Sequence, residues 1–337
     1  MIAKKICLLH TGGTIGMIKS ERGYTPREGY LETLLESIPD LSAPSMPYFE
    51  LVELEPLIDS SNMSVSGWNK IAREVADRYD AYDGFVILHG TDTMAYTASA
   101  LSFMLDGLSK PVILTGSQIP LCEVRSDGRD NLITSLLMAS DGIVNEVALY
   151  FGGRLLRGNR STKMSADGLL AFDSPNYPYL ATAGIGIKYN KSAFAKRSKS
   201  EEFSLRLFEE IPIGVLKVFP GMSFTLFDSV ISERLKGIVL ETFGSGNVPS
   251  ENNTLLPIIK KAFDNGAIVT VCSQCPQGTV ALGAYASSSP LKAAGAVSGF
   301  DMTTEAAVAK LYYLFSMGYS AKEIKSKMEK DLRGELS

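Results

Sequence analysis

The sequence contains few of the residues that bind metals or form disulfides. It has two histidines, His10 and His89, and four cysteines in 337 residues. The one Cys-x-x-C pair, Cys272 and Cys275, would need two further ligands to hold zinc, so we expect no metal. Four scattered cysteines also do not make the disulfide framework of a small secreted protein. A redox pair stays open as an alternative, but two buried thiols after a strand are favoured.

A basic excess and a long apolar run are also missing. Lys and Arg number 33 against 37 Asp and Glu, for a formal net charge of -4. Because nucleic-acid binding depends on clustered Lys and Arg, we expect no nucleic-acid partner. No apolar run approaches the roughly 18 residues of a membrane helix, and the first residues lack a cleavage-site pattern. We therefore expect no membrane association, no secretory signal and a cytoplasmic location.

Strands of the buried type alternate with helices along the chain, which predicts parallel sheets covered on both faces. At 337 residues the chain is long for a single core, so two domains are expected. Between 189 and 212 the composition shifts to Lys, Arg, Ser and Glu, which is typical of an exposed connection. We predict an α/β fold with a larger N-terminal parallel-sheet domain at 1–188, a linker at 189–212 and a smaller C-terminal α/β domain at 213–337.

Periodicity and turn residues place the individual elements. In the first domain we predict strands at 6–9, 49–57, 84–88 and 111–115, helices at 29–37, 64–79, 94–105 and 127–140, and a hairpin of 147–150 with 154–157. In the second domain we predict strands at 214–218, 237–240 and 267–271, and helices at 223–234, 255–263 and 305–315.

The first strand runs into a glycine-rich turn, Thr11-Gly12-Gly13-Thr14-Ile15-Gly16. Its glycine spacing matches neither the dinucleotide fingerprint nor the nucleotide-triphosphate loop, which argues against a phosphate site. Two interpretations stay open: a structural turn, or a turn that positions the Thr14 hydroxyl for chemistry. The polar stretch 17–29 that follows is predicted to be a loop, and it carries Tyr24.

Three predicted strand ends carry small hydroxyl or carboxyl residues, namely Thr14, Asp59-Ser60 and Thr91-Asp92. The carboxyl ends of strands in an open α/β sheet lie at one edge, so these groups are expected to converge on one crevice. A hydroxyl attacks a carbonyl carbon when a base takes its proton and donors hold the oxyanion. With histidine scarce, Lys163 and Tyr24 are the natural candidates for the proton transfer.

Two segments resemble the signatures of the bacterial-type L-asparaginases. These are Leu8-Leu9-His10-Thr11-Gly12-Gly13-Thr14-Ile15-Gly16 and Gly84-Phe85-Val86-Ile87-Leu88-His89-Gly90-Thr91-Asp92-Thr93-Met94. The resemblance extends over nearly the whole chain and is greatest to the cytoplasmic type I enzymes. It implies an amidohydrolase that converts L-asparagine to L-aspartate and ammonia through a threonine acyl-enzyme, without a metal or cofactor.

The resemblance also implies a role for each matching residue. Thr14 would be the nucleophile and Tyr24 its hydrogen-bonded activator, while Thr91, Asp92 and Lys163 would form the second catalytic group. The α-carboxylate and α-amine of the substrate would be held by Asp59, Ser60, Ser61 and Asp92, with Ser117 lining the side-chain pocket.

A homotetramer built as a dimer of dimers is a further implication of the resemblance. Asn247 matches a position that reaches a neighbouring site, and Thr162 and Cys275 match a second asparagine site that activates some type I enzymes. Where that site has an arginine for the effector carboxylate, this chain has Glu241. Because like charges repel, we expect weak or absent cooperativity toward asparagine.

Two other function classes compete with the hydrolase. A non-catalytic amino-acid sensor on the same fold would have no use for two activated hydroxyls. The amide-hydrolysing subunit of a tRNA-dependent amidotransferase would carry an additional N-terminal region and an RNA-binding partner. The first strand begins directly in this chain and the net charge is acidic, so we expect the hydrolase.

Overall fold

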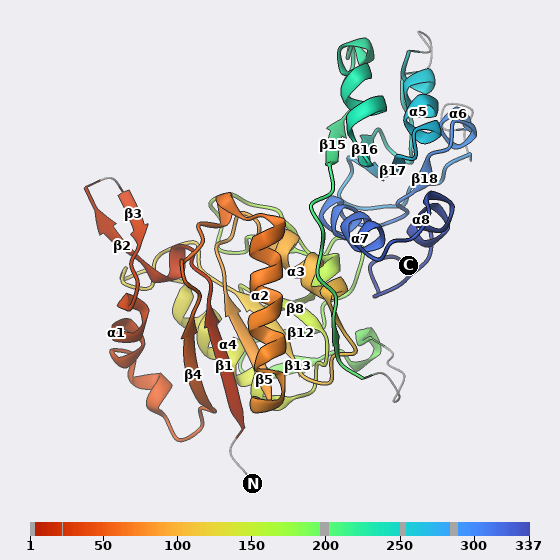
Figure 1. Cartoon of the computed structure of the whole chain (residues 1–337). Helices are drawn as coiled ribbons and strands as arrows, with labels where there is room; N and C mark the ends of the chain where they lie inside the picture. Colours follow the sequence, from red (N-terminus) through yellow and green to blue (C-terminus); the bar gives the residue numbers. More distant parts are fainter. Residues whose placement is uncertain (1–3, 22, 196–201, 250–253, 284–288) are drawn as a thin grey trace. The chain divides into compact units, whose positions relative to one another are not determined.

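The structure is a computed structural model that describes residues 4–21, 23–195, 202–249, 254–283 and 289–337. It divides into two compact units, Met1–Arg206 and Leu207–Ser337, and each has its own sheet (Figure 1). The division falls within the stretch 189–212 that the composition marks as a connection. Residues 196–201 of that stretch lie outside the described residues, while Tyr189 belongs to the sheet of the first unit.

The first unit contains an eight-stranded sheet in the order β13-β12-β9-β8-β7-β5-β1-β4. Neighbours from β4 to β8 are parallel and those from β8 to β13 antiparallel. The bounds are β1 (Lys5–His10), β4 (Tyr48–Glu53), β5 (Gly84–Leu88), β7 (Val112–Thr115), β8 (Val147–Phe151), β9 (Arg154–Arg157), β12 (Ala181–Ala183) and β13 (Ile187–Tyr189). The predicted parallel strands and hairpin are thus confirmed, whereas the short strands β12 and β13 were not predicted.

Helices cover both faces of this sheet, with α2 in front of it and α4 behind it in Figure 1. They are α1 (Tyr30–Glu36), α2 (Val65–Asp77), α3 (Met94–Met104) and α4 (Gly128–Asp141). Helix α2 begins where the Ser64 side chain accepts a hydrogen bond from the Gly67 N–H, and it buries Trp68, Ile71 and Val75 at steps of three and four. On the opposite face, Ile6 and Leu8 of β1 share a core cluster with residues of α1 and α4.

Shorter elements complete the first unit. The single turns are η1 (Thr14–Gly16), η2 (Pro39–Ser42), η3 (Ser60–Asn62), η4 (Tyr79–Ala81), η5 (Gly158–Arg160) and η6 (Lys191–Ala193). Two-stranded pairs form between β6 (Leu105–Asp106) and β14 (Ser204–Leu205), and between β10 (Thr162–Lys163) and β11 (Phe172–Asp173).

The predicted loop at 17–29 is wrong in part, because β2 (Met17–Ser20) and β3 (Gly23–Pro26) pair antiparallel within it. The Ser20 hydroxyl donates to the Gly23 carbonyl oxygen at 2.6 Å across this pair. The strands are four residues each, β2 is mostly half-buried and β3 mostly exposed, so no buried apolar run marks them in the sequence.

The second unit has a parallel four-stranded sheet in the order β15-β16-β17-β18. Its strands are β15 (Ile213–Lys217), β16 (Gly237–Thr242), β17 (Ile268–Ser273) and β18 (Val297–Ser298), and its helices are α5 (Leu255–Asp264), α6 (Ser289–Ala293), α7 (Thr304–Ser316) and α8 (Ala321–Met328). The predicted helix at 223–234 is wrong: the chain forms a 3₁₀ turn, η7 (Phe224–Phe227), and a π turn, η8 (Val230–Arg234). The Ser232 hydroxyl donates to the Asp228 carbonyl oxygen there, and such side-chain bonds compete with regular helix.

A buried ion pair holds the C-terminal segment of the second unit. Lys310 of α7 and Glu335 have fully buried side chains, with Nζ 2.5 Å from Oε1. Lys310 also donates to the carbonyl oxygens of Met328 and Lys330. Burying both charges has a large desolvation cost, which the pairing and these extra hydrogen bonds offset.

None of the helices in the described ranges has the length and apolar character needed to cross a membrane.

Candidate active site

The site residues lie at a topological switch point of the first sheet. Strand β1 lies between β4 and β5. The chain passes from β1 to β4 on one side and then crosses to β5 on the other, so the direction of the strand order reverses at β1. Ligand-binding crevices of open α/β sheets form at the carboxyl ends of such strands. Thr14 follows β1, Asp59 and Ser60 follow β4, and Thr91 follows β5, so all three groups lie at this edge.

Glycines allow the three strand ends to approach one another closely. Gly12 and Gly13 have φ of 118° and 90°, which favour glycine. A Cβ on Gly12 would lie 2.2 Å from the Ile58 carbonyl oxygen, and one on Gly13 would lie 2.3 Å from the Gly90 nitrogen. A Cβ on Gly90 would in turn lie 2.3 Å from the Ser60 hydroxyl oxygen, so that position has no room for a side chain. The glycine pair is therefore required to bring the Thr14 segment against the segment that carries Thr91.

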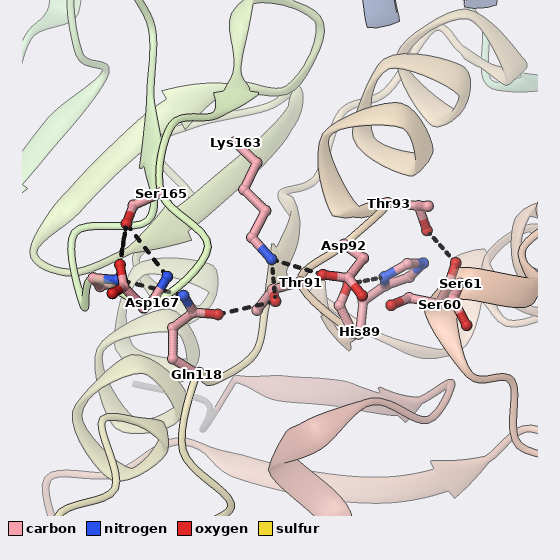
Figure 2. Close-up of polar contacts among 12 residues, drawn as sticks. Ser60, Ser61, His89, Thr91, Asp92, Thr93, Gln118, Lys163, Ser165 and Asp167 are labelled. Atoms are coloured by element: carbon pink, nitrogen blue, oxygen red, sulfur yellow. Dashed lines mark hydrogen bonds and ion pairs between the residues drawn. The ribbon is translucent and has the colours of Figure 1, made fainter.

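Lys163 joins this edge from a different part of the chain. Its Nζ donates to Thr91 Oγ1 at 2.9 Å and to Asp92 Oδ1 at 2.7 Å (Figure 2). Turn η5, which precedes β10, packs on α3, and the Gly158 backbone lies against the Ala98 carbonyl oxygen of that helix. Because α3 begins directly after Thr93, this packing returns Lys163 to the strand end with Thr91. The sequence-predicted trio Thr91, Asp92 and Lys163 is thus assembled.

Gln118 was not predicted as a site residue, yet it contacts the same hydroxyl. Thr91 Oγ1 donates to Gln118 Oε1 at 3.0 Å, and Gln118 Nε2 donates to the Gly168 carbonyl oxygen at 3.2 Å (Figure 2). The Asp127 carboxylate accepts from the Gln118 and Ile119 N–H groups and so fixes this loop. The one signal in the sequence was the position of Gln118 shortly after the strand that ends at Thr115.

Ser117 precedes this glutamine and is buried, and its hydroxyl has no hydrogen-bond partner among the described residues. A buried hydroxyl without a partner is costly, and a polar ligand group would satisfy it. Asp59 and Ser61 are exposed, whereas the Ser60 side chain is buried. The Asp59 carboxylate accepts from the Ser61 N–H at 3.0 Å. The Thr93 hydroxyl donates to the Ser60 carbonyl oxygen at 2.8 Å (Figure 2).

Thr14 and Tyr24 are not hydrogen-bonded to each other here. Thr14 is half-buried at the start of η1, and no described residue hydrogen-bonds to its hydroxyl. The exposed Tyr24 of β3 instead donates to Glu123 Oε1 at 2.7 Å. This hydrogen bond is the main cause that raises the pKa of Tyr24 above its usual value.

A buried hydrogen-bonded chain lies behind the site. In the His89 ring, Nδ1 is 2.7 Å from the Gly90 carbonyl oxygen and Nε2 is 2.9 Å from Thr97 Oγ1. A carbonyl oxygen only accepts, so Nδ1 carries the proton and Nε2 accepts from Thr97. Trp68 Nε1 donates to the same Thr97 oxygen at 3.1 Å. Burial lowers the pKa of His89 to about 4, so the ring is neutral at neutral pH.

The residues expected at a second, regulatory site are spread over both units. Thr162 lies in β10 of the first unit. In the second unit Glu241 Oε1 accepts from the Thr304 hydroxyl at 2.6 Å, and Asn247 forms a β-bridge with Phe243. Cys272 is buried, which raises its thiol pKa to about 12, but Cys275 is exposed. The expectation of two buried thiols is therefore wrong for Cys275, which lies beyond the end of β17.

Comparison with known families identifies the family to which the chain belongs. Residues 5–195 match the family model for the asparaginase N-terminal domain, and residues 212–328 match that for the glutaminase/asparaginase C-terminal domain. The chain belongs to the asparaginase family, which confirms the resemblance and the two-domain α/β architecture read from the sequence.

Individual relatives agree with this assignment. L-asparaginase 1 of Escherichia coli K12 is 46% identical over 337 residues, which cover 100% of this chain and 99% of that protein. The crystal structure of L-asparaginase I from Vibrio cholerae O1 biovar eltor has a TM-score of 0.92 at 47% identity, with 99% of each chain covered. A 60 kDa lysophospholipase of Mus musculus is 41% identical over 356 residues, or 99% of this chain and 63% of that protein.

Proposed function

We propose that this protein hydrolyses L-asparagine to L-aspartate and ammonia through an ester formed on Thr14. One observation carries the proposal: Lys163, Thr91 and Asp92 are in hydrogen-bond contact at the edge where Gly13 packs against Gly90. Thr14 follows Gly13 and Thr91 follows Gly90, so this backbone contact supports a site in which the two hydroxyls share one substrate. Family membership and the asparaginase relatives support the same reaction.

The chemistry proceeds in two displacements. Thr14 Oγ1 attacks the carbonyl carbon of the side-chain amide and its proton passes to the leaving nitrogen. The C–N bond then breaks, which releases ammonia and leaves an acyl ester on Thr14. Water then attacks the ester carbon, gives its proton back to Thr14 Oγ1 and releases aspartate. Tyr24 assists the first proton transfer after its hydroxyl leaves Glu123. Lys163 stabilises negative charge on Thr91 Oγ1, which eases proton transfer through that hydroxyl.

Substrate recognition uses the remaining groups at this edge. The carboxylates of Asp59 and Asp92 suit the α-ammonium group, and the hydroxyls of Ser60 and Ser61 suit the α-carboxylate. The buried Ser117 hydroxyl lines the pocket for the side-chain amide. The residues that carry this chemistry belong to this chain, and the reaction needs no metal or cofactor.

We further propose that the protein acts in the cytoplasm as a homotetramer, a dimer of dimers, with the domain boundary within 189–212. Exposed apolar side chains of the second unit support an association surface; they are Val215, Phe219, Leu226 and Val230. Light scattering coupled to gel filtration checks the assembly: a mass of four chains supports the tetramer, and a mass of one chain contradicts it.

The deciding experiment is ammonia release from asparagine by the wild type and by Thr14→Ala, with Thr11→Ala as the matched control. Thr11 is a buried threonine of the same turn whose hydroxyl donates to the Leu88 carbonyl oxygen. We expect turnover to vanish in folded Thr14→Ala and to persist in Thr11→Ala. Full turnover by folded Thr14→Ala would show that the nucleophile is another group.

A further inference from the structure

A histidine and a glutamate connect the two ends of the segment that carries Tyr24. His10 and Glu53 are the last residues of the parallel neighbours β1 and β4 and are in register with each other. Their side chains therefore lie on the same face of the sheet. His10 Nδ1 is 3.0 Å from Glu53 Oε1, and the imidazole ring is buried.

The His10 ring supports the start of this segment. A Cβ on Gly16 would lie 2.7 Å from His10 Nε2 and 2.8 Å from Cε1, so the ring packs directly against the Gly16 backbone. Gly16 ends η1, the turn that begins at Thr14, and β2 follows at once. The position of this ring thus defines where the turn with Thr14 ends.

The Glu53 carboxylate supports the other end. Its second oxygen, Oε2, accepts a hydrogen bond from the Gly29 N–H at 2.8 Å. Gly29 has φ of 68°, which favours glycine, and it is the residue from which α1 starts. A single carboxylate therefore bonds both to the ring beneath Gly16 and to the backbone at Gly29, on either side of β2 and β3.

The protonation of this pair follows from its chemistry. A carboxylate only accepts, so Nδ1 carries the imidazole proton, and Nε2 holds the lone pair. Within the described part of the chain, Nε2 has no hydrogen-bond partner, which agrees with that tautomer. Burial lowers the pKa of His10. The hydrogen bond to Glu53 and the negative charge of Glu53 oppose this decrease, and no other charge among the described residues acts on the ring. The ring is therefore neutral at neutral pH.

We propose that His10 and Glu53 are positioning residues that anchor both ends of the β2–β3 segment and thereby fix the backbone positions from which Thr14 and Tyr24 act in amide hydrolysis. The catalytic part of this proposal rests on the proposed function. The anchor itself is independent of it, because it makes the backbone between 14 and 29 more rigid whether or not the chain hydrolyses amides.

Two substitutions of His10 distinguish a hydrogen-bonded anchor from a ring that only fills space in the core. In His10→Asn the side-chain NH₂ group occupies nearly the position of Nδ1 and still donates to Glu53, but the rest of the ring is lost. In His10→Phe the ring remains and the donor is lost. The anchor predicts that kcat falls by about tenfold or more in His10→Phe, with KM changed less, and by less than about threefold in His10→Asn. A role in packing alone predicts the reverse order, which would overturn the proposal.

Glu53→Gln tests the other partner, and Glu50→Gln is its matched control. The amide introduced by Glu53→Gln has one acceptor oxygen for the two N–H donors that the carboxylate satisfies. Glu50 lies on the same strand and accepts hydrogen bonds from Tyr48 and Tyr82, remote from the β2–β3 segment. We expect Glu53→Gln to lower kcat and Glu50→Gln to leave it unchanged.

Hydrogen–deuterium exchange gives a readout that does not depend on activity. In His10→Phe and Glu53→Gln we expect faster exchange in peptides covering 14–29 and unchanged exchange in α7 and α8 of the second unit. If His10→Phe does not fold, exchange in Glu53→Gln alone tests whether the anchor exists. Unchanged exchange at 14–29, or an equal increase throughout the chain, would overturn the anchor. The two proposals can fail separately. If the wild type releases no ammonia but the variants still show faster exchange at 14–29 alone, the proposed function is rejected and the anchor is supported.

Discussion

Lys163 Nζ donates a hydrogen bond of 2.9 Å to Thr91 Oγ1, a residue 72 positions earlier in the chain. Lys163→Met removes this donor and the charge while keeping an unbranched stem of similar length. We expect kcat for ammonia release to fall by roughly 10²- to 10⁴-fold, the usual contribution of a proton-transfer group. The fold should persist because β10 is a two-residue strand at the edge of the site. Thermal unfolding checks the fold, and near-normal turnover in the folded variant would refute the role of Lys163.

Glu123 holds the Tyr24 hydroxyl, and the proposed mechanism requires Tyr24 to leave it. Glu123→Ala removes the acceptor, so Tyr24 reaches Thr14 without breaking a hydrogen bond to a charged group. We expect kcat/KM for asparagine to rise by about a few-fold. The pKa of Tyr24 should also fall toward its usual value, because the hydrogen bond to Glu123 is the main cause of the increase.

Ultraviolet titration of the phenol, with Tyr24→Phe to identify its signal, measures that change in pKa. A loss of turnover in Glu123→Ala would show instead that Glu123 supports the active arrangement of β3.

His89 makes the stability of the first unit depend on pH. Its pKa is about 4 in the folded protein against 6.5 in the unfolded chain, so the unfolded state binds the proton more readily. The contribution of neutral His89 to the free energy of unfolding is therefore fully present above pH 6.5. It decreases by up to roughly 3 kcal/mol as the pH falls through the folded-state pKa. Burial acts on His10 in the same direction.

Denaturant unfolding followed by fluorescence measures this dependence, because the one tryptophan, Trp68, is bonded to the Thr97 that contacts His89. His89→Gln does not titrate, so its free energy of unfolding should fall less between pH 6.5 and 4. Parallel curves for the two proteins would contradict the buried neutral ring.

Glu241 is expected to prevent activation by a second asparagine. Its carboxylate accepts from Thr304, and Lys217 Nζ lies 4.0 Å away. An incoming α-carboxylate meets a like charge there, so the rate should depend hyperbolically on asparagine concentration. A sigmoidal curve in the wild type that Glu241→Ala relieves would contradict this expectation.

The sequence was sufficient for the features that local chemistry determines. Apolar runs that end in glycine and threonine marked β1 and β5, and the alternation of strands with helices implied a shared edge for Thr14 and Thr91. The hairpin between β8 and β9 followed from Gly152 and Gly153, both of which have positive φ in the structure.

Contacts that depend on register or on distant segments could not be predicted. Gln118 bonds to Thr91 because Asp127 fixes its loop, and neither residue belongs to a recognisable motif. The His10–Glu53 contact depends on how β1 aligns with β4, which a single sequence does not specify. The pairing of β2 with β3 was missed because two short, partly exposed strands leave no apolar pattern in the sequence.

The ion pair of Lys310 and Glu335 gives the last residues of the second unit an importance that their position would not suggest. Loss of residues 335–337 would remove the carboxylate that pairs directly with this buried ammonium group and leave only the more distant charge of Asp331 among the acidic groups described as acting on it. The destabilisation would affect α7, which carries Lys310, and also the end of α8, because Lys310 donates hydrogen bonds to the carbonyl oxygens of Met328 and Lys330. Trimming this tail is therefore equivalent to a mutation in the protein core.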